Sequence, residues 1–264
     1  MSSSNIRSRI KEVTQDEATL KKTVVLGLSE FLGTAILVFL GCMGCAGSIS
    51  PSHLQITLNF GLSVMIVIQI FGHISHAHVN PAISVGALVL GKKTLTEALI
   101  YILCQTGGSV LGYGMLMIVT PISMSDPKKK NEFCVTRLSE DVSSFQGLIV
   151  EGIATAVLMM IACAVWDKRN EKNTDSVPIK FGLAVTALAT AAGPFTGCSM
   201  NPARSLGPAI WNNNFSQQWI YWIGPIGGST IAAFIYKTIF EIREIRSLEE
   251  PEAITLNTIE TDKN

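Results

Sequence analysis

The chain contains 264 residues, of which 48% are hydrophobic and only 15% are charged. Its 20 basic residues balance its 20 acidic residues, and its mean hydropathy is positive at +0.38. This composition excludes an ordinary water-soluble domain and indicates a membrane protein. We expect no nucleic-acid partner and no cofactor.

Six apolar stretches are long enough to cross a lipid bilayer as helices, which takes roughly 20 residues each. In chain order they lie at about 23–46, 54–73, 98–122, 142–166, 179–195 and 217–240. The predicted fold class is therefore an all-α membrane protein with six transmembrane helices.

Polar segments flank the apolar region at both ends. Residues 1–22 lack the apolar core of a cleavable signal peptide, so we interpret them as an N-terminal tail. Residues 241–264 are polar and mildly acidic, and we expect them to form a disordered C-terminal tail. Residues 23–240 then make up one membrane domain.

The membrane domain repeats itself at an offset of 121 residues. Asn80-Pro81-Ala82 recurs as Asn201-Pro202-Ala203, and 201 − 80 = 121. The same offset relates three further landmarks: Glu30 and Glu151, Thr34 and Thr155, and Phe60-Gly61-Leu62 and Phe181-Gly182-Leu183. Four landmarks at one spacing indicate a duplicated unit, with one repeat at about 23–125 and the other at about 142–240. Because each repeat has three spans, the second lies upside down relative to the first, the design that places a substrate path near the membrane midplane.

Lys and Arg residues in the loops predict the orientation of the chain. An even number of spans places both termini on one side, and most of the loop Lys and Arg residues lie on that side. The opposite side has Lys128–Lys130 and Arg137 in one loop. We therefore expect both termini to be cytoplasmic and the chain to lie in the plasma membrane. The sequon at Asn214 then falls on the outer face, where it is either glycosylated or unused.

Cysteine and histidine residues do not predict a metal site. The six cysteines lie mostly within apolar segments and lack metal-ligand spacing, at positions 42, 45, 104, 134, 163 and 198. Cys42 and Cys45 resemble a C-x-x-C pair, but they end an apolar span, so we interpret them as small packing residues. His73, His76 and His78 share one short stretch with no carboxylate nearby in the sequence, and we expect no metal there.

Each Asn-Pro-Ala tripeptide predicts the start of a short helix. Asn is a strong helix N-cap, and Pro is well tolerated at the first helical position. The apolar runs that follow, Ile83–Leu90 and Arg204–Trp211, are too short to cross a membrane. Non-helical backbone at membrane depth persists only where it is buried in protein or lines a water-filled cavity. Two half-helices that enter from opposite faces would therefore meet near the centre by their N-termini.

This arrangement suits the passage of neutral, hydrogen-bonding solutes. Each helix N-terminus presents unpaired N–H groups and about half a positive charge, so two of them repel cations, including hydronium. Asn80 and Asn201 would each direct an amide donor into the path. Carbonyl groups of the extended stretches His76–Val79 and Gly197–Met200 would supply acceptors. We expect protons and ions to be excluded.

The two motif regions resemble the pore loops of the aquaporin, or major intrinsic protein, family. They read His-Ile-Ser-His-Ala-His-Val-Asn-Pro-Ala at 73–82 and Thr-Gly-Cys-Ser-Met-Asn-Pro-Ala-Arg-Ser-Leu-Gly at 196–207. The match covers nearly all of 23–240. The resemblance implies six tilted helices, two re-entrant half-helices and a homotetramer in the lipid bilayer with one pore per subunit. It assigns structural support to Glu30 and Glu151. It assigns the pore-lining loop positions to His78, Val79, Gly197, Ser199 and Met200.

The resemblance also assigns an outer selectivity ring to Phe60, Ala189, Cys198 and Arg204. Water-selective relatives usually carry histidine at the position of Ala189. Alanine leaves a wider opening with an apolar wall beside Phe60, and pore diameter and hydrogen-bonding groups decide selectivity in such channels. We therefore predict that glycerol passes alongside water, and urea as well.

Other positions resemble the water-channel pattern instead. They are Ser205 after the second Asn-Pro-Ala-Arg, Ala209, and Tyr221-Trp222. A water-channel-like body without the ring histidine resembles the insect entomoglyceroporins, a branch that conducts glycerol. The alternatives are a water-selective channel with little solute permeability and a mainly structural or adhesive membrane protein. We expect no enzyme, because the sequence shows no nucleotide-binding loop and no nucleophile–base pair.

Overall fold

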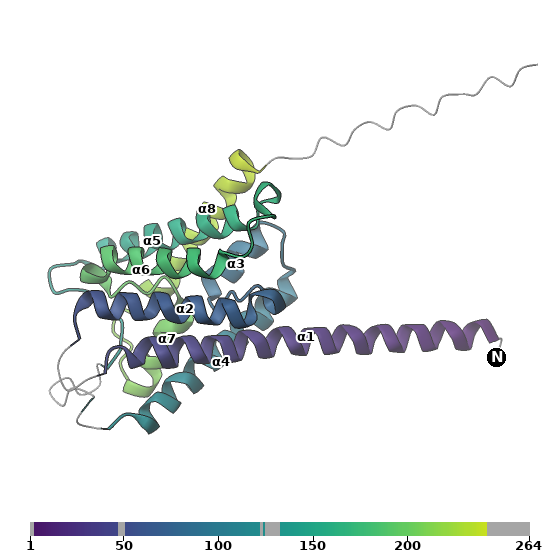
Figure 1. The fold of residues 1–264 in the computed structure, drawn as a ribbon, viewed down its shortest axis with the longest axis horizontal. Coiled ribbons are helices and arrows are strands. Elements are labelled where there is room, and N and C mark those ends of the chain that lie inside the picture. Colours follow the sequence, from purple (N-terminus) through teal and green to yellow (C-terminus); the bar gives the residue numbers. More distant parts are fainter. Residues whose placement is uncertain (1–2, 47–50, 122–123, 125–132, 242–264) are drawn as a thin grey trace, which may run out of the picture.

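The structure is a computed structural model that describes residues 3–46, 51–121, 124 and 133–241, with side chains from residue 18 onward. Each regular element in these residues is a helix, as the predicted fold class requires (Figure 1). In chain order they are α1 (Ser3–Met43), α2 (His53–Ser75), α3 (Pro81–Val89), α4 (Leu95–Val119), α5 (Ser144–Val165), the 3-10 turn η1 (Lys168–Asn170), α6 (Val177–Thr196), α7 (Pro202–Asn212), α8 (Ile220–Ile235) and the π-helical turn η2 (Tyr236–Phe240).

In each repeat a short helix lies between the second and third spans, as the two repeats predict. Within the described residues, five helices are long and apolar enough to cross a membrane: α1 from Ala18 onward, α2, α4, α5 and α6. The sixth predicted span forms α8, which has 16 residues and continues directly into η2. The two motif helices are short, with 9 residues in α3 and 11 in α7.

The N-terminal segment is helical, and its interpretation as a tail stays a prediction. Helix α1 begins at Ser3, so the segment interpreted as an N-terminal tail continues the first span as helix. This part of α1 projects beyond the helical bundle in Figure 1. The predicted C-terminal tail lies outside the described residues after Glu241, and Lys128–Lys130 also lie outside them.

Glycine residues let the helices of each repeat pack backbone against backbone. A Cβ atom at Gly112 on α4 would collide with the carbonyl group of Ala35 on α1. In the second repeat, a Cβ atom at Gly228 on α8 would collide with the carbonyl group of Gly152 on α5. Small residues are the usual means of close helix packing in membranes. The two repeats therefore use the same kind of helix pair.

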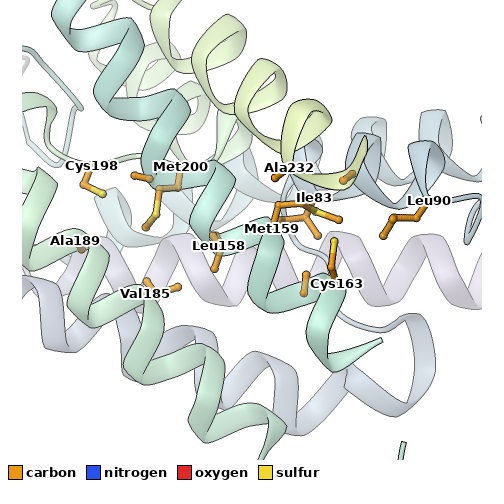
Figure 2. Close-up of a cluster of buried hydrophobic side chains, with 13 residues drawn as sticks. Ile83, Leu90, Leu158, Met159, Cys163, Val185, Ala189, Cys198, Met200 and Ala232 are labelled. Atoms are coloured by element: carbon orange, nitrogen blue, oxygen red, sulfur yellow. The ribbon is translucent and has the colours of Figure 1, made fainter. Parts of the chain in front are cut away.

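A cluster of buried apolar side chains fixes the first half-helix within the second repeat. Ile83 of α3 packs with Leu158 and Met159 of α5, Val185 of α6 and Ala232 of α8 (Figure 2). This packing carries the start of α3 to the middle of the bundle.

Large apolar side chains also remain exposed along the spans. Among them are Leu28, Leu32, Leu99, Leu103, Ile149, Ile153, Leu183 and Ile231. A surface of this kind suits contact with lipid tails or with other membrane-embedded chains.

Candidate functional site

Two loops lead into the half-helices, and we call them the first loop (residues 76–80) and the second loop (residues 197–201). Each follows a helix that ends in the left-handed conformation, α2 at His76 with φ of 69° and α6 at Gly197 with φ of 75°. These two residues are 121 positions apart, so the ends of α2 and α6 are related by the same offset as the two repeats.

The backbone of both loops is left-handed at matching positions. These are His76, Ala77 and Val79 in the first loop and Gly197, Cys198 and Met200 in the second. The expectation of extended stretches was therefore wrong. Positive φ is uncommon for non-glycine residues and is an outlier for a β-branched residue such as Val79, whose φ is 43°. Such strain persists only where surrounding groups determine the conformation.

Glu30 of α1 holds the first loop in this conformation. Its carboxylate oxygens accept hydrogen bonds from the backbone N–H groups of His78 at 2.9 Å and Val79 at 2.7 Å. The hydroxyl of Ser75 and the amide of Gln105 donate to the same carboxylate at 2.6 and 2.7 Å. Glu30 is fully buried, and these four donors compensate for the loss of water around its carboxylate.

Glu151 of α5 holds the second loop in the same way. It accepts from the backbone N–H groups of Ser199 and Met200, both at 2.8 Å, and from the hydroxyl of Thr196 at 2.7 Å. It is also fully buried. Both carboxylates therefore accept hydrogen bonds from the backbone of the loops.

The two motif asparagines connect the half-helices to each other. Asn80 caps α3 by accepting from the N–H of Ala82 at 2.9 Å, and Asn201 caps α7 by accepting from the N–H of Arg204 at 3.2 Å. The amide nitrogen of Asn80 donates to the carbonyl of Met200, and that of Asn201 donates to the carbonyl of Val79, both at 2.8 Å. The N-termini of the two helices therefore meet.

This reciprocal pairing uses one donor of each asparagine. A side-chain amide nitrogen has two N–H groups, and both asparagines line the same cavity. The second N–H of each is thus placed to donate to a molecule in the cavity. Pro81 and Pro202 occupy the first helical positions, as predicted. Serine hydroxyls from the neighbouring spans hold the half-helices in place: Ser229 donates to the carbonyl of Ala82 at 2.6 Å, and Ser109 donates to that of Ala203.

A cavity of about 910 Å³ runs past both motifs. Its lining includes His53 and His73, which are 20 residues apart on α2, a separation of about 30 Å along a helix. Four of the five loop positions assigned to the path line this cavity: His78, Gly197, Ser199 and Met200. Val79 instead packs its side chain with Leu37, Val67 and Ile68, and reaches the site through its carbonyl group.

His78 has two aromatic neighbours that the sequence did not indicate. Its ring lies 5.3 Å from the Trp166 ring and 5.1 Å from the Tyr101 ring, measured between centroids, and its Nδ1 lies 3.1 Å from the hydroxyl of Ser84. Trp166 also lines the cavity. Trp166 follows the last residue of α5, and the sequence offered no pattern that links it to His78.

The four residues assigned to the selectivity ring all line this cavity. The guanidinium carbon of Arg204 lies 4.5 Å from the centroid of the Phe60 ring, which is within cation–π range. The sulfur of Cys198 lies 3.5 Å from the carbonyl of Leu188 on α6, the residue before Ala189. Figure 2 shows Ala189 on α6 beside the loop that carries Cys198. Ala189 therefore contributes only a methyl group to the cavity wall at this point.

The interpretation of Cys42 as a packing residue was wrong, because Cys42 forms a disulfide with Cys134. The partners are 92 residues apart in sequence, and pairing cannot be deduced from cysteine spacing alone. One signal was present: both residues lie on the predicted outer side, where disulfides persist. The segment that carries Cys134 also reaches α7, since the hydroxyl of Thr136 donates to that of Ser205 at 2.7 Å.

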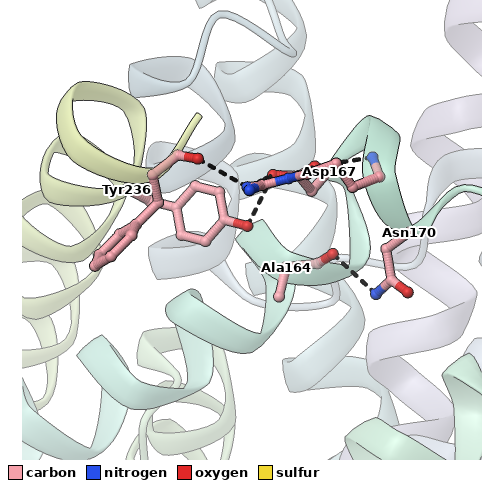
Figure 3. A network of polar contacts seen from close by, with 6 residues as sticks. Ala164, Asp167, Asn170 and Tyr236 are labelled. Atoms are coloured by element: carbon pink, nitrogen blue, oxygen red, sulfur yellow. Dashed lines mark hydrogen bonds and ion pairs between the residues drawn. The ribbon is translucent and has the colours of Figure 1, made fainter. Parts of the chain in front are cut away.

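A polar network joins the far ends of α5 and α8 (Figure 3). Arg169 donates to the carboxylate of Asp167 at 2.6 and 2.8 Å and to the carbonyl of Phe240 at 2.7 Å. The hydroxyl of Tyr236 donates to Asp167 at 2.9 Å. The guanidinium of Arg169 holds the pKa of the Asp167 carboxyl well below its usual range, so the pair stays ionised at neutral pH.

Comparison with known proteins gives matches over most of the chain. The family described as Major intrinsic protein matches residues 17–236. Aquaporin-2 of Rattus norvegicus is 36% identical over 238 residues, which cover 89% of this chain and 85% of that protein. Aquaporin-5 of Homo sapiens is 37% identical over 240 residues, which cover 89% of this chain and 88% of that protein.

A solved structure has the same fold. It is the X-ray structure of the aquaglyceroporin from Plasmodium falciparum, which superposes with a TM-score of 0.75 and covers 82% of this chain and 96% of that one. The two sequences are 24% identical, so this similarity concerns the fold.

Proposed function

The chain belongs to the major intrinsic protein family, and from that premise we propose that it is a passive channel for glycerol and water, and also for urea. As a member of this family it is a multi-pass integral membrane protein that passes water and small solutes, and it is not an enzyme. The proposal concerns which solutes pass, and which residues select them.

The proposal that glycerol passes rests on Ala189. It lines the cavity together with Phe60 and Arg204, and its side chain is a single methyl group. Glycerol has hydroxyl groups along one edge and carbon atoms along the other. Its hydroxyls can accept from Arg204 while its carbons contact Phe60 and Ala189. Pore diameter and the placement of donors decide selectivity in such channels, so this opening admits a solute larger than water.

The centre of the path supports the exclusion of protons and other cations. The N-termini of α3 and α7 meet there, held by the contacts of Asn80 and Asn201 with the opposite loop. Each N-terminus contributes about half a positive charge. The two asparagines present donors rather than acceptors to a passing oxygen atom. A water molecule that accepts from both cannot relay a proton through this point.

The proposed orientation has cytoplasmic termini in the plasma membrane. The disulfide between Cys42 and Cys134 supports it, because disulfides persist on the extracellular side of a cell membrane. The same orientation places Asn214, the candidate glycosylation site between α7 and α8, on the outer face. Residues 23–240 form the channel domain in this proposal.

A homotetramer with one pore per subunit completes the proposal. The exposed apolar side chains of the spans offer the surface that such an assembly and the surrounding lipid require.

Two substitutions at one position test the proposal. Ala189→His should lower glycerol flux by roughly tenfold, the factor for a steric barrier of about 1.4 kcal/mol, and should retain water flux. Ala189→Ser, which hardly changes the volume, should retain both fluxes. Stopped-flow light scattering of proteoliposomes under glycerol and sorbitol gradients measures the two fluxes on the same preparation.

The water-selective channel is the second candidate, favoured by Ser205. Its hydroxyl is fully buried and lies in hydrogen-bonding range of Ser199 and Thr136, so this serine joins α7 to the second loop. Equal and negligible glycerol flux in the wild type and in Ala189→His would select this candidate. The absence of both water flux and glycerol flux would indicate a structural or adhesive protein.

A further inference from the structure

Arg204 makes its side-chain hydrogen bonds with Cys134. Cys134 belongs to residues 133–139, which we call the outer segment because the proposed orientation puts them on the outer face. Within the described residues, the guanidinium donates to the carbonyl oxygen of Cys134 at 2.9 Å and lies 3.5 Å from the Cys134 sulfur. The guanidinium also lies over the face of the Phe60 ring. Arg204 is 8% exposed, so the geometry of this buried charge is set largely by where Cys134 lies.

Cys134 is itself held by a covalent bond. Its disulfide with Cys42 ties it to the end of α1, where Cys42 is fully buried. The backbone at Cys134 has φ of 56°, a left-handed conformation that a non-glycine residue rarely adopts without restraint. The carbonyl that accepts the hydrogen bond from Arg204 therefore belongs to a residue whose side chain is fixed by a disulfide.

The contacts on either side of Cys134 also join the outer segment to the channel wall. The hydroxyl of Tyr113 donates to the carbonyl of Phe133 at 2.7 Å. Ser139 donates its N–H to the carbonyl of Phe195 at 2.9 Å. These are single hydrogen bonds, each with a modest net contribution to stability. The disulfide is the one covalent tie in the described part of this segment.

We propose that the Cys42–Cys134 disulfide is a positioning element of the selectivity ring, which keeps the Arg204 guanidinium against the wall. When it is broken, the carbonyl of Cys134 can move and the guanidinium can turn into the opening. A narrower ring hinders glycerol more than water, because glycerol is the larger molecule. The ratio of glycerol to water permeability is then under redox control from the outer side. This inference rests on the proposed glycerol permeability.

Chemical reduction tests the inference on folded protein. A phosphine reductant breaks the S–S bond: the phosphine takes the oxygen of one water molecule and becomes a phosphine oxide, while both thiols take up the hydrogens. Treated proteoliposomes should show a roughly two- to tenfold lower glycerol-to-water permeability ratio, the factor for losing one hydrogen bond. Reoxidation with a diazene, which accepts the two thiol hydrogens, should restore the ratio.

Peptide mapping without reductant should recover Cys42 linked to Cys134, and mapping after treatment should recover two thiols. Cys42→Ser combined with Cys134→Ser should show the lowered ratio and no response to reductant. Cys45→Ser, which removes the neighbouring free thiol and keeps the disulfide, should respond as the wild type does.

The permeability ratio distinguishes a disulfide that positions Arg204 from a disulfide that only stabilises the fold. Loss of folded channels lowers both permeabilities in proportion and leaves their ratio unchanged. An unchanged ratio with the disulfide fully reduced would therefore overturn the inference. If oxidised wild-type protein passes no glycerol, the proposed function fails instead. The inference is then judged by water permeability per channel, which should fall reversibly on reduction, and a constant value would overturn it.

Discussion

Two buried carboxylates determine the backbone at the centre of this protein. Glu30 and Glu151 each accept from two consecutive backbone N–H groups and from a hydroxyl at the end of the preceding helix. A carboxylate can do this because it offers only acceptors. The left-handed residues of both loops depend on these bonds.

Replacing Glu151 with glutamine should therefore damage the second loop. The amide has one acceptor oxygen, and its NH2 group would face an N–H of Ser199 or Met200. We expect Glu151→Gln to lower the free energy of unfolding by about 1–3 kcal/mol, the usual penalty for an unsatisfied buried group. Thermal unfolding of purified protein measures this loss.

Glu140→Gln is the matched control, because it makes the same chemical change at an exposed position. An equal unfolding temperature for Glu151→Gln and Glu140→Gln would show that the carboxylate does not support the loop.

At the scale of elements, two short helices act as one unit. Each asparagine caps its own helix and donates to the loop that leads into the other helix. The positive ends of α3 and α7 are thereby fixed near each other and near the cavity. In the proposed function, this pairing makes the path unfavourable for cations.

Asn201→Asp should weaken this barrier to cations. Aspartate still caps α7, but it loses the donor to Val79 and adds a negative charge where the helix ends meet. We expect cation leak to rise by roughly five- to thirtyfold, the factor for a change of about 1–2 kcal/mol. A pH-sensitive dye inside proteoliposomes reports proton entry under an imposed gradient.

Asn213→Asp makes the same substitution at an exposed residue just after α7 and should leave the leak unchanged. A leak that does not differ between the two variants would contradict the account of the helix ends.

At the scale of the molecule, the duplication made most of the architecture predictable. The offset of 121 residues gave both half-helices, their asparagine caps and the paired glutamates. The left-handed loop residues were missed because strain of this kind depends on the buried carboxylates, which local propensity does not register. The Cys42–Cys134 disulfide and the contact between Trp166 and His78 were missed because they join segments that share no pattern.

The selectivity ring also could be predicted only in part from the sequence. Its four residues could be assigned from the resemblance, and the structure places all four along one cavity. Their roles in selection stay predictions, as do the tetramer, the orientation and the likeness to the insect branch. The sequence did not indicate that the carbonyl of Cys134, far in sequence from the second Asn-Pro-Ala motif, accepts a hydrogen bond from Arg204.

The most direct test of the central claim, that the ring beside Ala189 admits glycerol, is the response of wild-type proteoliposomes to two solutes of matched osmolarity. With sorbitol, the vesicles should shrink and stay shrunken. With glycerol, they should shrink and then reswell faster than protein-free vesicles do. Identical traces for glycerol and sorbitol would contradict the account.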